Sequence, residues 1–138
     1  IEDTTFVALK AFAKAELKQY QNKRSEAITL YSQLLIDHKG DPIEDEALLE
    51  QAQLYEVEGR LEQARDNYQL IIDNYGDGIL ADDAYYRLGL LYQEHLVDLL
   101  KAKELFEKII FSHADSIYFI DARRRYRRLR GDQNDKAF

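Results

Sequence analysis

The sequence predicts an all-α protein built as a solenoid of antiparallel helix pairs. One observation is an internal repeat of 37 to 38 residues, which small and aromatic residues share: Ala27, Ala64 and Ala102, then Tyr31, Tyr68 and Phe106. Periods of this length indicate repeat architectures. Within each copy, apolar residues recur at the three- and four-residue steps of a helix. One proline and six glycines in 138 residues leave room for long helices.

The repeats divide into helices at residues with capping chemistry. Asp41 is expected to cap a helix start, because Pro42 suits the first turn and Glu44 stands three residues after the cap. Asp115 and Ser116 offer a similar start later in the chain. The seven predicted helices span residues 4–20, 23–38, 42–57, 60–75, 79–95, 98–113 and 116–130.

The turns inside the repeats are also predictable. Gly59 lies between two predicted helices, and Asn22 holds the equivalent position one repeat earlier. Asparagine is the next most tolerant residue for a left-handed conformation, so the two turns are expected to be alike. The extra residue of the 38-residue interval falls between Tyr92 and Ala102, where we expect a turn.

Composition argues against several classes of function. The net charge of −7 and the pI near 5.0 argue against general nucleic-acid binding. The chain has no cysteine, and no two of its three histidines stand four residues apart, so we expect no metal, cofactor or catalysis. No apolar run approaches the roughly 18 residues of a membrane span. The chain begins at Ile1 and holds no methionine, so a fragment or a processed form is expected.

Two copies carry a family resemblance. Their shared pattern is a small residue with an aromatic residue three positions later, a turn, and then an alanine with an aromatic residue four positions later. The residues are Ala52, Tyr55, Gly59, Ala64, Tyr68 and Gly76 in the second copy, and Ala84, Leu88, Gly89, Tyr92, Ala102 and Phe106 in the third. This pattern resembles the tetratricopeptide repeat, whose usual period is about 34 residues. The longer period, with the segment 74–92 between units, resembles bacterial envelope proteins such as the Tol-Pal coordinator and outer-membrane assembly lipoproteins.

The resemblance implies a right-handed α-α solenoid of about three and a half repeats. The repeat domain would span residues 1–131, with units at about 4–38, 42–75 and 79–113, a terminal capping helix at 116–130 and a polar tail at 132–138. The resemblance favours the bacterial periplasm or cell envelope over the cytoplasm. It also implies a non-catalytic scaffold that binds a protein or peptide in a concave groove, lined by the first helix of each unit.

Helical spacing gives the residues expected to line that groove. They are Phe12 and Glu16, then Leu49 and Gln53, then Tyr86, Arg87 and Leu90, and finally Arg124, Arg125 and Arg128. The groove would mix apolar residues with acid at one end and arginine at the other, which suits a peptide or helix of complementary charge. Tyr86 and Arg128 are the strongest candidates, because aromatic residues and arginines dominate binding hot spots.

Both ends of the array leave alternatives open. The helix at 4–20 is apolar around most of its circumference, so we expect preceding repeats or a homodimer to cover it. An alternative function follows, in which the chain is a structural spacer segment of a longer repeat protein and self-associates through this helix. The arginines of 123–130 form either a solubilising end cap or a site for an acidic partner.

Overall fold

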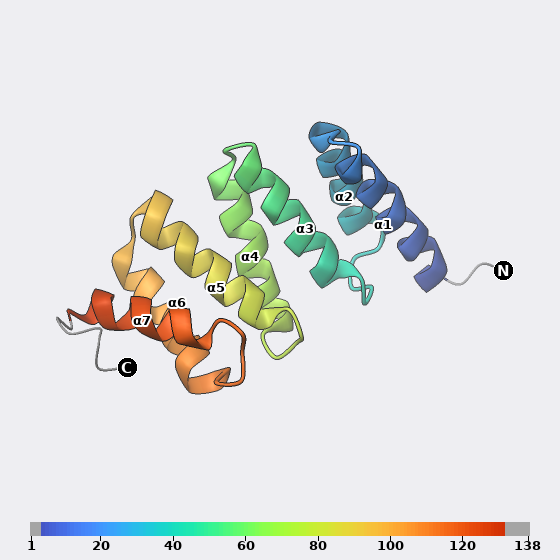
Figure 1. Ribbon diagram of the computed structural model, residues 1–138. Coiled ribbons are helices and arrows are strands. Elements are labelled where there is room, and N and C mark those ends of the chain that lie inside the picture. The colour runs from blue at the N-terminus through green and yellow to red at the C-terminus, as the bar shows by residue number, and fades with distance from the viewer. Residues whose placement is uncertain (1–3, 132–138) are drawn as a thin grey trace. The chain divides into compact units, whose positions relative to one another are not determined.

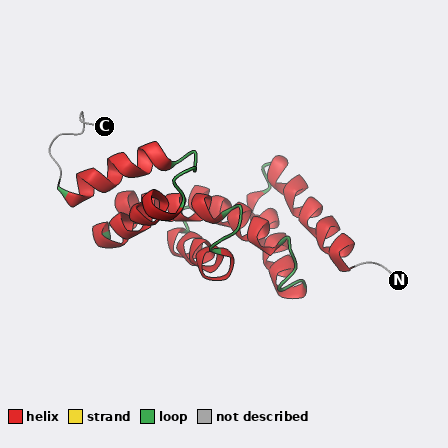
Figure 2. Ribbon diagram, turned by 90° about the horizontal axis from the view of Figure 1, so that it is seen from below, coloured by secondary structure: helices red, strands yellow, loops and turns green. Residues whose placement is uncertain are grey.

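The computed structural model describes residues 4–131, and within them the chain is helical without a strand (Figures 1 and 2). Seven α-helices and one short π-helix follow one another. They are α1 (Thr4–Tyr20), α2 (Arg24–Asp37), α3 (Glu44–Val57), α4 (Leu61–Tyr75), α5 (Ala81–Leu91), η1 (Tyr92–Leu96), α6 (Leu99–Ser112) and α7 (Phe119–Arg130). The all-α solenoid class predicted from the sequence is confirmed. The predicted tail at 132–138 lies outside the described residues.

The chain divides into two compact units, residues 1–71 and 72–138. In the first unit, α1 packs against α2, and α2 packs against α3. In the second unit, α6 packs against both α5 and α7. Each unit therefore repeats the same arrangement, in which a helix pair receives the first helix of the next pair.

Small residues and rings fill the core of the first unit. Ala15 and Ala52 are fully buried, and so are Tyr31 and Tyr68 on the following helices. The two tyrosine hydroxyls make equivalent hydrogen bonds, since Tyr31 donates to Gln19 Oε1 at 2.8 Å and Tyr68 donates to Glu56. Burial and the nearby carboxylates raise the pKa of Tyr31 above its ordinary value. The repeat seen in the sequence is thus a repeat of hydrogen bonds as well as of packing.

A buried polar network joins three helices of the first unit. Gln51 on α3 is only 2% exposed, and its Nε2 donates to the carbonyl of Ile28 at 2.9 Å and to Ser32 Oγ at 2.7 Å, both on α2. Asn67 on α4 donates from Nδ2 to Gln51 Oε1 at 2.9 Å and to the carbonyl of Leu48 at 3.2 Å. Buried amides are costly unless paired, so this network specifies how α2 lies on α3.

Gly89 on α5 lies directly against the Phe106 ring of α6 in the second unit. Gly89 and Phe106 are both fully buried, and a methyl group added at Gly89 would lie 2.7 Å from the Phe106 ring. Alanine fills the equivalent position in the first two repeats. A side chain at position 89 would therefore clash with the Phe106 ring where it stands, and glycine avoids that clash.

Three equivalent turns each contain one residue in the left-handed backbone conformation. Asn22 has φ 62° and Gly59 has φ 75°, which confirms the expected likeness of these turns. The third turn places Val97 at φ 52°, although a β-branched residue is strained there. This turn follows η1, so the extra residue of the third repeat is absorbed within a π-helical turn that continues α5.

Backbone hydrogen bonds locate the insertion. The amide that follows the left-handed residue bonds back five residues in the first two turns, from Lys23 to Lys18 and from Arg60 to Tyr55. In the third turn, the bond from Asp98 to Tyr92 spans six residues. The sequence predicted one α-helix from 79 to 95; instead α5 ends at Leu91 and η1 takes up the added residue.

The start of α3 differs from the predicted capping box. Asp41 accepts a hydrogen bond from the Ile43 amide at 3.0 Å, and a turn then precedes the helix, which begins at Glu44. The Glu44 carboxylate accepts from the Gly40 amide at 2.9 Å rather than from Asp41. Ser116 acts like Asp41 before α7, because its Oγ accepts from the Tyr118 amide at 3.1 Å. Both aspartate and serine thus stabilise a turn that leads into the helix.

Candidate functional site

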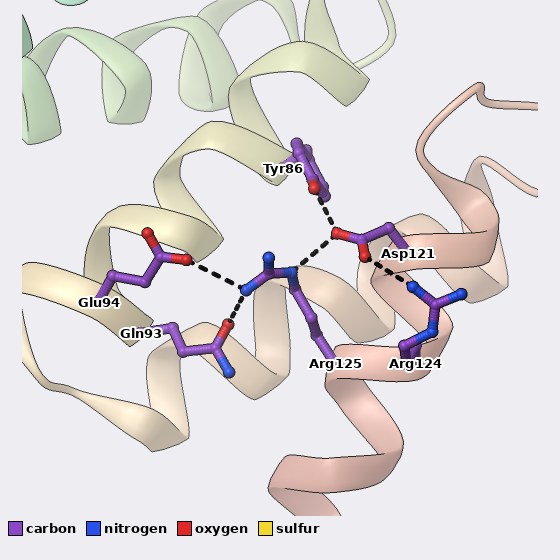
Figure 3. Close-up of polar contacts among 6 residues, drawn as sticks. All are labelled: Tyr86, Gln93, Glu94, Asp121, Arg124 and Arg125. Atoms are coloured by element: carbon purple, nitrogen blue, oxygen red, sulfur yellow. Dashed lines mark hydrogen bonds and ion pairs between the residues drawn. The ribbon is translucent and has the colours of Figure 1, made fainter. Parts of the chain in front are cut away.

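The densest polar cluster in the second unit joins α5, η1 and α7 (Figure 3). Arg125 on α7 is at its centre. Its Nε donates to Asp121 Oδ2 at 2.8 Å, and its Nη1 donates to Gln93 Oε1 at 2.8 Å and lies 3.3 Å from Glu94 Oε1. Tyr86 on α5 donates its hydroxyl hydrogen to the same Asp121 carboxylate. The cluster therefore fixes α7 against α5 and the π-helical turn.

A second tyrosine–carboxylate pair lies beside the first. Tyr118, just before α7, donates to Asp83 Oδ1 on α5 at 2.6 Å. The Tyr86 and Tyr118 rings stack with their centroids 4.3 Å apart and their planes 9° from parallel. Thus α5 supplies Tyr86 and Asp83, whereas α7 supplies Asp121 and the residue before α7 is Tyr118, so the two pairs are reciprocal.

The cluster alters the titration of its own groups. Partial burial alone would raise the pKa of Asp121, but the hydrogen bonds from Tyr86 and Arg125, with the charges of Arg125 and Arg124, outweigh it and lower that pKa. Burial and the bond to Asp83 raise the pKa of Tyr118 to about 12. Burial and Asp121 likewise raise the pKa of Tyr86. Asp121 and Arg125 are therefore charged, and both tyrosines neutral, at physiological pH.

The predicted groove residues of the second unit fall into two groups, those held within the polar cluster and those at least partly exposed beside it. Tyr86 and Arg125 are engaged inside the protein, as described above. Arg124 is about half exposed with its Nη1 3.4 Å from Asp121 Oδ1, Arg128 is exposed, and Leu90 is partly buried. Arg87 is partly buried, and its Nε is the only buried side-chain nitrogen or oxygen without a hydrogen-bond partner among the described side chains of residues 6–131.

The predicted groove residues of the first unit are less accessible. Phe12 is 7% exposed and packs on Tyr31 with ring centroids 5.6 Å apart, and Leu49 is 8% exposed. Gln53 is partly buried and Glu16 is exposed. Phe12 and Leu49 are core residues of this unit, so only the polar pair could reach a partner without rearrangement.

Sequence reasoning missed the partners that engage Tyr86. Asp121 and Tyr118 were not among the predicted site residues, although each lies 35 positions from its bonded partner on α5. A tyrosine and an aspartate recurring at one spacing, in both orders, is a signal that the sequence contains. It becomes meaningful once α5 and α7 are known to lie side by side.

No group of three histidine or acidic side chains within the described residues is placed to hold a metal ion. None of the described helices has the length and apolarity needed to cross a membrane.

The helix pairs and their stacking define the chain as a helical-repeat protein. Residues 46–78 and 83–116 match the family model described as tetratricopeptide repeat. These two segments are therefore tetratricopeptide repeats, and repeats of this kind typically serve as protein-binding scaffolds. No protein of curated function matches it.

Solved structures support the same family. A tetratricopeptide repeat protein from Parabacteroides merdae is 25% identical with a TM-score of 0.74, and the match covers 93% of this chain and 47% of that one. The Sgt2 TPR domain from Aspergillus fumigatus is 24% identical with a TM-score of 0.64, covering 89% of this chain and 76% of that one. The chain therefore spans about half the length of the bacterial protein, and the resemblance to envelope proteins stays a prediction.

Proposed function

We propose that the chain is a non-catalytic scaffold that binds an acidic peptide or partner segment through the first helices of its repeats. In the second unit, the binding face consists of Arg87 and Leu90 on α5 with Arg124 and Arg128 on α7. Three guanidinium groups beside an apolar side chain suit an extended segment that alternates acidic and apolar residues.

The observation that carries this proposal is the unmet donor of Arg87. A buried N–H without an acceptor costs free energy, so native proteins rarely leave one. A carboxylate or carbonyl from a bound segment would supply the acceptor after a small side-chain movement. Tyr86 and Arg125 support the face indirectly, because they hold α7 in place beside α5.

Peptide selection followed by affinity measurement tests the proposal. Peptides selected from a random library on the intact chain should be enriched in aspartate and glutamate. Arg87→Gln and Arg128→Gln should each weaken the selected peptides about ten-fold, the usual effect of losing a charged hydrogen bond. Lys108→Gln, an exposed cation on α6, is the matched control and should change nothing. Equal affinity in all three variants would refute the assignment.

A second candidate function rests on a different observation. Phe6, Leu9 and Leu17 on α1 are each about half exposed, at 54%, 48% and 54%. An exposed apolar stripe of this kind favours a spacer segment that self-associates through α1. Light scattering on the purified chain separates the two candidates, because the spacer function requires a dimer that Leu9→Glu disrupts.

A further inference from the structure

An open groove lies between α1 and α2 at the beginning of the first unit. It has a volume of about 320 Å³, with Val7, Ala11 and Leu30 among its apolar residues. Lys10 and Lys14 line its α1 side, whereas Asp37 and His38 lie on the α2 side. The Gln33 amide donates to Asp37 Oδ1 at 2.9 Å, so that carboxylate already has a partner within α2.

The second repeat shows what covers a groove of this kind. Counterparts 37 positions beyond five of the nine groove residues are buried there, with exposures of 0 to 8%. They are Ala47 for Lys10, Leu48 for Ala11, Gln51 for Lys14, Asn67 for Leu30 and Ile71 for Leu34. α2 packs on α3 at this place, where Ile28 and Ser32 accept hydrogen bonds from Gln51. The α1–α2 groove is thus the first repeat's version of a surface that receives a helix.

The groove differs from its counterpart in charge. Lys10 replaces Ala47, and Lys14 replaces Gln51; the third repeat has Ala84 and Leu88 at these positions, both fully buried. The Lys10 ammonium lies 5.3 Å from the centre of the Phe6 ring. A helix that presented residues like Ile28 and Ser32 of α2 to this surface would bury the Lys14 ammonium without an acid opposite it, which is costly.

We infer that the α1–α2 groove docks an amphipathic helix of a partner protein whose apolar stripe is bordered by aspartate or glutamate. Such a helix would pack on Val7, Ala11 and Leu30 as α2 packs on α3, and its carboxylates would meet Lys10 and Lys14. A second copy of the chain that docked through α7 would fit less well, because α7 carries six arginines, and like charges repel. This inference is independent of the binding face on α5 and α7.

Peptides derived from α2 provide matched probes. Ser32 faces Gln51 in the second repeat, and Gln51 corresponds to Lys14, so a change at residue 32 should face Lys14. Three stapled helical peptides of residues 24–37 would carry serine, Ser32→Glu or Ser32→Lys. Fluorescence anisotropy should show the Ser32→Glu peptide binding the intact chain about ten-fold more tightly than the Ser32→Lys peptide.

Variants of the chain then locate the effect. Lys10→Ala and Lys14→Gln together restore the residues of the second repeat, and should remove the preference for the acidic peptide while circular dichroism shows an unchanged helix content. Lys108→Gln is the control and should keep the preference. Any of three results would overturn the inference: equal binding of all three peptides, no binding of the acidic peptide at about 1 mM, or a preference for the acidic peptide that survives the double variant. So would a dimer of the unliganded chain that Ala11→Glu breaks, since a second copy would then occupy the groove.

Discussion

Replacing Gly89 with alanine tests how closely α5 and α6 pack. The added methyl carbon would lie 2.7 Å from Phe106 Cε1 and 2.9 Å from Cζ, about 1 Å short of an ordinary carbon–carbon contact. Phe106 is fully buried, so its ring has no free space to move into. Overpacking of this kind costs about 1–3 kcal/mol, whereas alanine in place of glycine gains about 1 kcal/mol in helix propensity. We expect the free energy of unfolding to fall by about 1 kcal/mol.

Urea denaturation followed by circular dichroism measures the change. Adding Phe106→Leu should remove most of the penalty of Gly89→Ala, because the smaller side chain vacates the contact; the coupling between the two changes should be about 1 kcal/mol. Ala52→Gly probes the equivalent position in the second repeat and should destabilise by about 1 kcal/mol through lost helix propensity. If Gly89→Ala instead stabilised the chain by about 1 kcal/mol, as at an exposed helix position, the proposed close packing would be wrong.

Three further predictions follow from the polar and backbone features. The lowered pKa of Asp121 gives stability that is present above its unfolded pKa of about 4 and is lost as pH falls through the lower folded value. The difference in Tm between wild type and Asp121→Asn should therefore shrink from pH 7 towards about pH 3. A constant difference would contradict this. Val97→Asn should raise the free energy of unfolding by about 1 kcal/mol by relieving the left-handed valine, and Asn22→Val should lower it similarly; no change in urea midpoints would argue against strain. Gln51→Leu should cost about 2–3 kcal/mol in the same assay, because it removes the partner of buried polar groups on α2 and α4, and a neutral result would show that the network adds no stability.

Helix positions were predictable because the same pattern of residues recurs several times along the sequence. The repeated alanines and aromatic residues fixed all seven α-helices to within a few residues, and Asn22 behaves like Gly59 as its chemistry suggested. The π-helical turn was not predictable in the same way. From the sequence, a single inserted residue suggests a longer turn between two helices. The hydrogen bond from the Asp98 amide to the Tyr92 carbonyl shows instead that the helix itself widens.

The surroundings of the predicted groove residues were harder to predict, for a physical reason. Helical spacing gives the direction in which a side chain points, but it does not say whether a neighbouring helix already uses it. Tyr86 and Arg125 were both predicted to line the groove, and both are bonded to Asp121. Phe12 shows the same limit, since a position on the groove side of α1 is also within reach of Tyr31.

The π-helical turn has a consequence for how this chain can be altered. An inserted residue in a regular helix rotates everything beyond it by about 100°, which would turn the packed face of the helix away from its neighbours. At η1 the insertion is confined, because α6 resumes the ordinary register and Ala102 is again fully buried. The junction at Val97 and Asp98 is therefore a natural position for lengthening the protein, and a spectroscopic label or a short peptide tag placed there should leave the flanking helices intact.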